Sequence, residues 1–451
     1  MLVAFTVENF LSFDQETEFS MVAGNSTNHP NHCVTVSNQA KIQLLKMGVI
    51  YGANASGKSN FVKAIDFARD LVVHGFNSVS FEKKYFRLDK NNAHKDTKFE
   101  FQIKLDTQIY AYGFVLRLTT QTLKEEWLVE VGESEDKPIF ERTVLENGKS
   151  EISINLALDS NTANRFSVYQ QDVKNNQLFL TELNNKNLED IANIEPITGF
   201  FRWLKKQLRI VFPESKYAGI DFIGRNDTMS NLFTPLLVHF NTGISGISTQ
   251  ELDFDKTMDK LPEEIKTQLL TDMVSDTAME VRIEGERFSL FRDKDNEVKI
   301  ARLNTQHTLK NSNEHENFNL KDESDGTRRL FDLIPLIIDT IKSPKTYIVD
   351  EIDRSLHPEL TQKFLQMFIA NTTNNNSQLI ITTHESNLLD AKLLRNDEIW
   401  FTEKNKEGAT KLYSLEEFKP QHNNDIEKAY LQGRFGAIPF IADTMQLNWS
   451  N

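Results

Sequence analysis

Residues 52–59, Gly-Ala-Asn-Ala-Ser-Gly-Lys-Ser, decide how this chain folds, because they match the pattern G-x-x-x-x-G-K-[ST]. The mostly apolar residues 44–51 before them are typical of a strand, and residues 60–72 after them carry apolar side chains at helical spacing. In this context the glycines let successive backbone N–H groups turn toward one anion at the start of the helix. The sequence therefore predicts a loop that binds the phosphates of a nucleoside triphosphate.

The residues of this loop have separate predicted tasks. Lys58 is expected to reach the β- and γ-phosphates, and the Ser59 hydroxyl is expected to bind Mg²⁺. ATP and Mg²⁺ are thus the predicted cofactors. The residues predicted to contact the nucleotide are Gly52, Asn54, Ala55, Ser56, Gly57, Lys58, Ser59 and Asn60.

Length and composition limit the class of protein. A chain of 451 residues is long enough for about two or three domains. Its net charge of −14 argues against a surface that coats nucleic acid, although a local basic patch stays open. The single cysteine, Cys33, excludes an internal disulfide and fits a reducing cytoplasm. No apolar run reaches the roughly 18 residues that a membrane span needs, so we expect a cytoplasmic protein without a membrane partner.

The pattern along the chain predicts an α/β fold with three parts. The first, residues 1–177, would hold the phosphate loop and an antiparallel β subdomain, because residues 1–22, 97–132 and 138–154 alternate like strands and hairpins. The second, 178–277, would be a mainly helical insertion. The third, 278–451, would contain a β-rich patch, a polar loop at 304–319 and a dense α/β block.

Two acidic residues end a later strand. Residues 346–349 are apolar or β-prone, and Asp350 and Glu351 follow them. At the nucleotide, Asp350 would hold Mg²⁺ and Glu351 would polarise the attacking water. The alternative is a buried strand that ends in a solvated acidic turn, because this pattern is weak by itself.

A second glycine turn, Ser324-Asp325-Gly326-Thr327, precedes a helix predicted over 328–341. Its free N–H groups could bind an anion, or Ser324 or Thr327 could simply cap the helix. Pro335 lies inside this helix and is expected to kink or split it.

The strand predicted at residues 378–384 ends in His384. A histidine there could hydrogen-bond the γ-phosphate and the catalytic acid, or it could only cap the strand.

Taken in order, these elements resemble the head of an ABC-type ATPase, and within that class the SMC- and RecF-like branch. Residues 52–60 and the stretch Asn9-Phe-Leu-Ser-Phe13 carry the likeness. The chain is more similar still to bacterial defence ATPases of the RloA and AbiEii-like group, through residues 323–327, 350–358 and 432–439. The resemblance implies a mixed β-sheet flanked by helices.

The resemblance also implies a mechanism and partners. Two heads would pack head-to-tail, with Ser324, Gly326 and Thr327 of one copy facing the ATP on Lys58 of the other. Glu351 and His384 would be catalytic, Ser59 and Asp350 would bind the metal, and Asp353 and Ser355 would form the D-loop. The ATP-driven switch would control a separate effector nuclease or toxin in anti-phage defence.

Some features depart from the wider class or leave alternatives. The signature turn is Ser-Asp-Gly-Thr rather than Ser-Gly-Gly-Gln, and both Gln102 and Gln177 are candidates for the glutamine loop. A DNA-repair ATPase that clamps DNA directly is the second hypothesis. Its support is a predicted basic helix face formed by Arg202, Lys205, Lys206 and Arg209, for which a solvated surface is the simpler interpretation. A scaffold that binds ATP without turnover is the third.

Overall fold

The computed structural model describes residues 1–36, 42–186, 188, 190–216, 227–273, 279–284, 286–293, 295–418 and 426–437. The chain forms two compact units. The first contains residues 1–213, 344–353 and 368–451, and the second contains residues 214–343 and 354–367.

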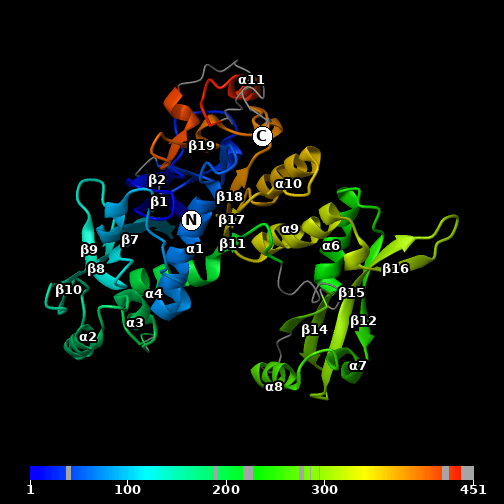
Figure 1. Cartoon of the computed structure of the whole chain (residues 1–451), viewed down its shortest axis with the longest axis horizontal. Coiled ribbons are helices and arrows are strands. Elements are labelled where there is room, and N and C mark those ends of the chain that lie inside the picture. The colour runs from blue at the N-terminus through cyan, green and yellow to red at the C-terminus, as the bar shows by residue number, and fades with distance from the viewer. Residues whose placement is uncertain are drawn as a thin grey trace, which may run out of the picture. The chain divides into compact units, whose positions relative to one another are not determined.

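A six-stranded, largely parallel sheet organises the first unit (Figure 1). Its strands, in spatial order, are β11 (Leu208–Val211), β17 (Thr346–Val349), β18 (Gln378–Thr383), β5 (Met47–Gly52), β19 (Ile399–Lys404) and β20 (Thr410–Ser414). Only β20 runs antiparallel to its neighbour. Every residue of β5, β17 and β18 is buried, as expected for strands covered on both faces.

A second sheet, of seven antiparallel strands, lies in the same unit. Its strands, in spatial order, are β10 (Ser150–Ile154), β9 (Lys137–Val144), β8 (Thr122–Glu130), β7 (Gln108–Arg117), β6 (Thr97–Leu105), β1 (Leu2–Glu8) and β2 (Thr17–Ser20). A short hairpin joins β3 (Cys33–Thr35) and β4 (Gln43–Leu45). The predicted α/β class with an antiparallel β subdomain is therefore confirmed.

Helix α1 (Lys58–His74) packs its apolar face into one cluster with both sheets. Its Phe61 ring lies 5.9 Å from the ring of Phe5 in β1, and Ile348 and Ile380 of the parallel sheet belong to the same cluster. This packing fixes the helix that starts directly after the phosphate loop. The smaller helices of the unit are α2 (Ser160–Asp172), α3 (Phe179–Asn184), α4 (Glu195–Arg202) and α11 (Ile426–Leu431).

The second unit has its own antiparallel sheet and helices. The strands are β12 (Gly246–Leu252), β13 (Met279–Ile283), β14 (Glu286–Arg292), β15 (Val298–Thr308) and β16 (His315–Asn319). The helices are α6 (Asp227–His239), α7 (Phe254–Met258), α8 (Glu263–Asp272) and α9 (Asp325–Lys342). Helix α10 (Pro358–Asn371) begins in this unit and ends in the first. Among the described residues, no helix combines the length and the apolar character needed to cross a membrane.

The prediction of a loop at residues 304–319 is wrong. Strand β15 continues to Thr308, and after a short turn β16 pairs with it from Asn319 opposite Asn304 to His315 opposite Thr308. Most of β16 is exposed, so this hairpin carries polar side chains without losing its backbone pairing. Much of the polarity that suggested a loop belongs to exposed residues of β16 and of the turn before it.

The described elements between residues 178 and 277 are mostly helices, with strands β11 (Leu208–Val211) and β12 (Gly246–Leu252) among them. The predicted divisions after residues 177 and 277 do not coincide with the unit boundaries, because β11 pairs with β17 and so holds residues up to 213 in the first unit. Strand β12 adds β-structure inside the predicted helical insertion.

The predicted basic helix face does not form. Arg202 ends α4, residues 203–207 form a π-helical turn, and Arg209 lies in β11. Arg202 also pairs with Glu195 on its own helix. The four cations therefore do not share one helical stripe, because the chain changes from helix to strand within the stripe.

Pro335 does not divide α9, which is one helix from Asp325 to Lys342. A proline inside a helix costs about 3 kcal/mol. The buried side chains around it, such as Leu333, Ile334 and Ile337, each contribute about 1.5–3 kcal/mol when fully buried, which offsets that cost.

Candidate nucleotide-binding site

The register of the parallel sheet brings the predicted site residues of the first unit together. Tyr51 of β5 pairs with Thr383 of β18, and Val349 of β17 pairs with Ile381. All three strands run in the same direction, so Gly52, Asp350 and His384 leave the sheet at one edge. Ligands of open α/β sheets bind at such carboxyl ends.

The phosphate loop holds two residues at positive φ, and one of them is a glycine. Ala55 has φ 63° and Gly57 has φ 120°, both in the left-handed region. A Cβ atom at Gly57 would lie 2.1 Å from Oγ1 of Thr410, so this position admits no side chain. The loop therefore forms a closely packed turn ahead of α1.

Hydroxyl groups of neighbouring elements support this loop. Oγ1 of Thr410 donates to the Ser56 carbonyl over 2.9 Å and lies 2.8 Å from Oγ of Ser12. Nδ2 of Asn60 donates to the same Ser12 hydroxyl, and Oγ of Ser56 lies 2.7 Å from Oγ1 of Thr402. Ser12 belongs to the N-terminal stretch that carried the family resemblance, which gives that stretch a structural task.

Lys58 points back over the loop. Its Nζ atom donates to the carbonyls of Gly52 (2.7 Å) and Ala53 (3.1 Å) and lies 3.2 Å from Nδ1 of His384. Burial lowers the pKa of Lys58 to about 8, and the nearby carboxylates, led by Asp350, oppose this shift. Among the described residues, the hydrogen-bond partners of the ammonium group include no carboxylate, although the carboxylates of Asp350, Asp353 and Glu351 are near enough to affect its pKa.

This pKa predicts how nucleotide binding depends on pH. The loop motif predicts that the charged form of Lys58 binds phosphate, and that form disappears as the pH rises through about 8. We expect the dissociation constant for Mg·ATP to rise up to about tenfold per pH unit above that value. Fluorescence titration from about pH 7.5 to pH 9.5 measures it. A Lys58→Arg protein keeps its charge and should show no such slope, whereas a flat wild-type profile would contradict the prediction.

Thr382 joins the two acidic residues to the neighbouring strand. Its Oγ1 atom donates to Oδ1 of Asp350 over 2.6 Å and accepts from the backbone N–H of Glu351 over 2.8 Å. The Asp350 side chain is buried, and Glu351 has φ 48°. The hydroxyl therefore orients one carboxylate and holds the backbone turn that carries the other.

Replacing Thr382 by valine keeps the shape and removes this hydroxyl. We expect the free energy of unfolding to fall by about 1–3 kcal/mol, because the Glu351 N–H loses its partner. We also expect kcat to fall about tenfold, since Asp350 loses its orientation. Urea unfolding and steady-state ATPase assays measure the two effects. Thr372→Val, which removes an equally buried hydroxyl bonded to the Phe368 carbonyl, should lower stability alone. Equal kcat losses in both variants would contradict this role.

Asp353 and His384 meet at the same edge. Oδ2 of Asp353 accepts from the backbone N–H of His384 over 3.4 Å. Oδ1 of Asp353 is buried and has no hydrogen-bond partner among the described residues. Since a buried polar atom without a partner is costly, this oxygen is available to accept a hydrogen bond from a bound group.

The signature-turn residues lie in the second unit, at the start of α9. Ser324 caps that helix by accepting from the Thr327 N–H over 3.1 Å, as the simpler interpretation of the turn predicts. A Cβ atom at Gly326 would lie 2.8 Å from the Ser355 carbonyl, and Ser355 has φ 64°. Within this unit, the signature turn and Ser355 of the predicted D-loop are therefore in contact.

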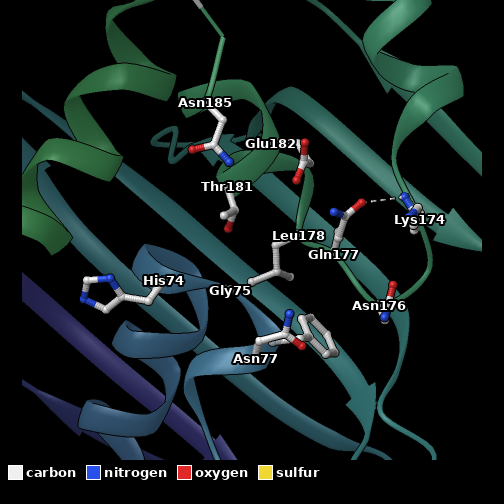
Figure 2. Close-up of a pocket in the computed structure, with 11 residues that line it drawn as sticks. His74, Gly75, Asn77, Lys174, Asn176, Gln177, Leu178, Thr181, Glu182 and Asn185 are labelled. Carbon is white, nitrogen blue, oxygen red and sulfur yellow. Dashed lines mark hydrogen bonds between the residues drawn. The ribbon is translucent and has the colours of Figure 1, made fainter. Parts of the chain in front are cut away.

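Neither candidate for the glutamine loop lies at the strand ends. Gln102 is in the middle of β6 and donates to Glu100. Gln177 lines a pocket of about 280 Å³ with His74 and Gly75 at the far end of α1, and its side chain accepts from the Lys174 N–H (Figure 2). A helix of 17 residues is about 25 Å long, which separates Gln177 from the phosphate loop.

The supporting hydroxyls were missed at the sequence level. Ser12, Thr382, Thr402 and Thr410 come from four separate parts of the chain, and single threonine or serine residues give no pattern. Only Thr382 could have been suggested from the sequence. It lies two residues before His384 at a predicted strand end, and side chains at such an end can contact the acidic end of a neighbouring strand.

One sequence family spans the residues of this site from Gly52 to His384. The sequence family described as "AAA domain, putative AbiEii toxin, Type IV TA system" matches residues 48–390. A comparison with curated proteins found no significant match.

Solved structures of SMC heads are similar at 13% identity. An SMC head bound to the C-terminal winged-helix domain of ScpA has a TM-score of 0.43 over 92% of this chain and 99% of that one. The SMC head from Thermotoga maritima has a TM-score of 0.38 over 92% and 98%. An SMC head with an extended coiled coil, bound to the C-terminal domain of ScpA and derived from Pyrococcus furiosus, has 0.39 over 96% and 99%. Because the family match spans most of the 451 residues, the chain belongs to this family of AbiEii-type AAA domains.

Proposed function

We propose that the chain is an Mg²⁺-dependent ATPase that works as a nucleotide-driven switch. The observation that carries this proposal is the common edge of β5, β17 and β18, where Lys58, Glu351 and His384 follow adjacent parallel strands. A cation, a carboxylate pair and a histidine beside a glycine turn form the set that phosphoryl transfer to water needs.

The residues present fit both ATP and Mg²⁺. The loop offers backbone N–H groups at the start of α1, and the positive φ of Gly57 lets the backbone turn toward an anion there. For the metal, Ser59 offers a hydroxyl and Asp350 a buried carboxylate, and oxygen ligands of this kind suit Mg²⁺. When bound, the metal neutralises charge on the phosphates. The nucleotide contacts would come from Gly52, Asn54, Ala55, Ser56, Gly57, Lys58, Ser59 and Asn60.

The catalytic tasks that we propose belong to residues at this edge of the sheet. Glu351 orients and deprotonates the attacking water, while Thr382 holds its backbone. His384, which now lies against Lys58, contacts the γ-phosphate once Lys58 turns to it. The free oxygen of Asp353 accepts a hydrogen bond at the same edge. Together these residues bind, position and activate water without a covalent intermediate.

The switch requires a second copy of the chain. By resemblance to ABC-type heads, Ser324, Gly326 and Thr327 of one copy face the nucleotide held by the other, with Asp353 and Ser355 beside them. ATP would then favour the paired state, and hydrolysis would release it. Light scattering measures this pairing as a doubling of the molar mass when ATP is added to a variant that cannot hydrolyse it. A persistent monomer at saturating ATP would contradict the proposal.

The family description names a toxin of a toxin–antitoxin system, which supports a role in a defence system of that type. The separate partner, an effector nuclease or toxin, is proposed from the resemblance to defence ATPases. Clamping DNA directly is the second candidate, but its basic helix face does not form. ATP-dependent co-purification of the neighbouring gene product supports the first role. Salt-sensitive binding of duplex DNA by the isolated protein supports the second.

A further inference from the structure

Glu323, the residue directly before the signature turn, is held in a small network within the second unit. One carboxylate oxygen, Oε1, accepts from Oγ1 of Thr305 over 2.5 Å and lies 2.8 Å from Nε2 of His307. The Glu323 side chain is only 9% exposed, and Thr305 is fully buried. A carboxylate that is mostly withdrawn from water and shared by two donors has a fixed position.

The network connects the turn to both strands of the β15–β16 hairpin (Figure 1). Thr305 and His307 belong to β15. Phe318 of β16 lies with its ring 4.9 Å from the His307 imidazole, and its carbonyl oxygen lies 3.3 Å from Oγ1 of Thr305. The position of Ser324 therefore depends on the hairpin through the Glu323 side chain.

A separate contact holds the body of α9. Asp332, two turns into the helix, accepts from Arg287 of β14 over 3.1 Å and from Lys216 over 2.9 Å. Loss of the Glu323 network would therefore leave α9 attached to its sheet and loosen only its first turn.

We propose that Glu323 is a positioning residue that sets the signature turn for the nucleotide of a second copy. This inference rests on the proposed function, because the turn acts there only when two copies pair. Thr305 and His307 hold the Glu323 carboxylate, and Glu323 acts through the position of Ser324, which follows it in the chain. Its loss affects the pairing of copies and leaves ATP binding by the phosphate loop intact.

The test compares Glu323→Ala with Glu323→Gln, each in a protein that also carries Glu351→Gln. Analytical ultracentrifugation with Mg·ATP gives the dissociation constant of the dimer, and fluorescent ATP gives the affinity of the phosphate loop. We expect alanine to weaken dimerisation at least about tenfold, with nucleotide affinity within about twofold of the parent. Glutamine, whose amide oxygen can still accept from both donors, should restore dimerisation to within about threefold.

The exposed Glu316 of the same hairpin provides the matched control, and Glu316→Ala should dimerise like the parent. If Glu323→Ala does not fold, Thr305→Val and His307→Ala each remove one donor and should weaken dimerisation about threefold. Dimerisation equal to the parent in these variants would overturn the positioning role alone. A Glu351→Gln parent that does not dimerise would overturn the proposed function, and this inference with it.

Discussion

Replacing Lys58 by alanine should weaken Mg·ATP binding by at least about 100-fold, because the substitution removes the cation that contacts the phosphates. A hydrogen bond to a charged group contributes about 1.5–3 kcal/mol, and Lys58 can form more than one. Its described partners in the loop are two carbonyls and a histidine, so no structural ion pair is lost. The melting temperature should stay within a few degrees of wild type. Isothermal titration calorimetry measures the affinity.

Lys63 supplies the control for this variant, since it lies on the same helix and is exposed. Lys63→Ala should bind Mg·ATP like the wild type. Unchanged binding by Lys58→Ala would remove the phosphate loop from nucleotide recognition.

Replacing Glu351 by glutamine should lower ATP turnover about 1000-fold and leave ATP binding intact. Glutamine has the same shape and keeps the backbone bond to Thr382, but its amide cannot accept the proton of the attacking water. The paired state should therefore persist with ATP bound. Phosphate release and light scattering measure the two effects.

Glu359→Gln, at an exposed position in the first turn of α10, serves as the comparison and should hydrolyse ATP normally. If Glu351→Gln retained the wild-type rate, another group would have to be the base.

The parts of the site that follow from local pattern were predictable from the sequence. Short, mostly apolar runs such as residues 47–51 and 378–383 indicate buried strands, and both runs are buried in the structure. The glycine spacing around Gly57 indicates a phosphate turn, because a residue with a side chain does not fit at Gly57. Parallel order then places Asp350 and His384 at one edge. Each of these inferences depends on neighbours in sequence.

Features that depend on distant contacts were not predictable. Thr382 belongs to the site only because its strand lies beside β17, which carries Asp350 at its end. The polar residues 304–319 form strands because β15 pairs with β12 on one side and with β16 on the other. The prediction of a basic helix face was wrong for the same reason. Strand β11 pairs with β17, and this pairing decides the conformation from Leu208 onward in place of the helical spacing. Tertiary pairing decides the conformation where local preference is weak.

The central claim is that each ATP lies between the phosphate loop of one copy and the signature turn of another. Mixing two inactive proteins tests it most directly: Lys58→Ala retains an intact turn, and Ser324→Arg retains an intact loop. A mixed dimer then holds one complete site of two. Half of randomly formed dimers are mixed, so an equimolar mixture should recover about a quarter of the wild-type ATPase rate. A mixture as inactive as its components would contradict the account.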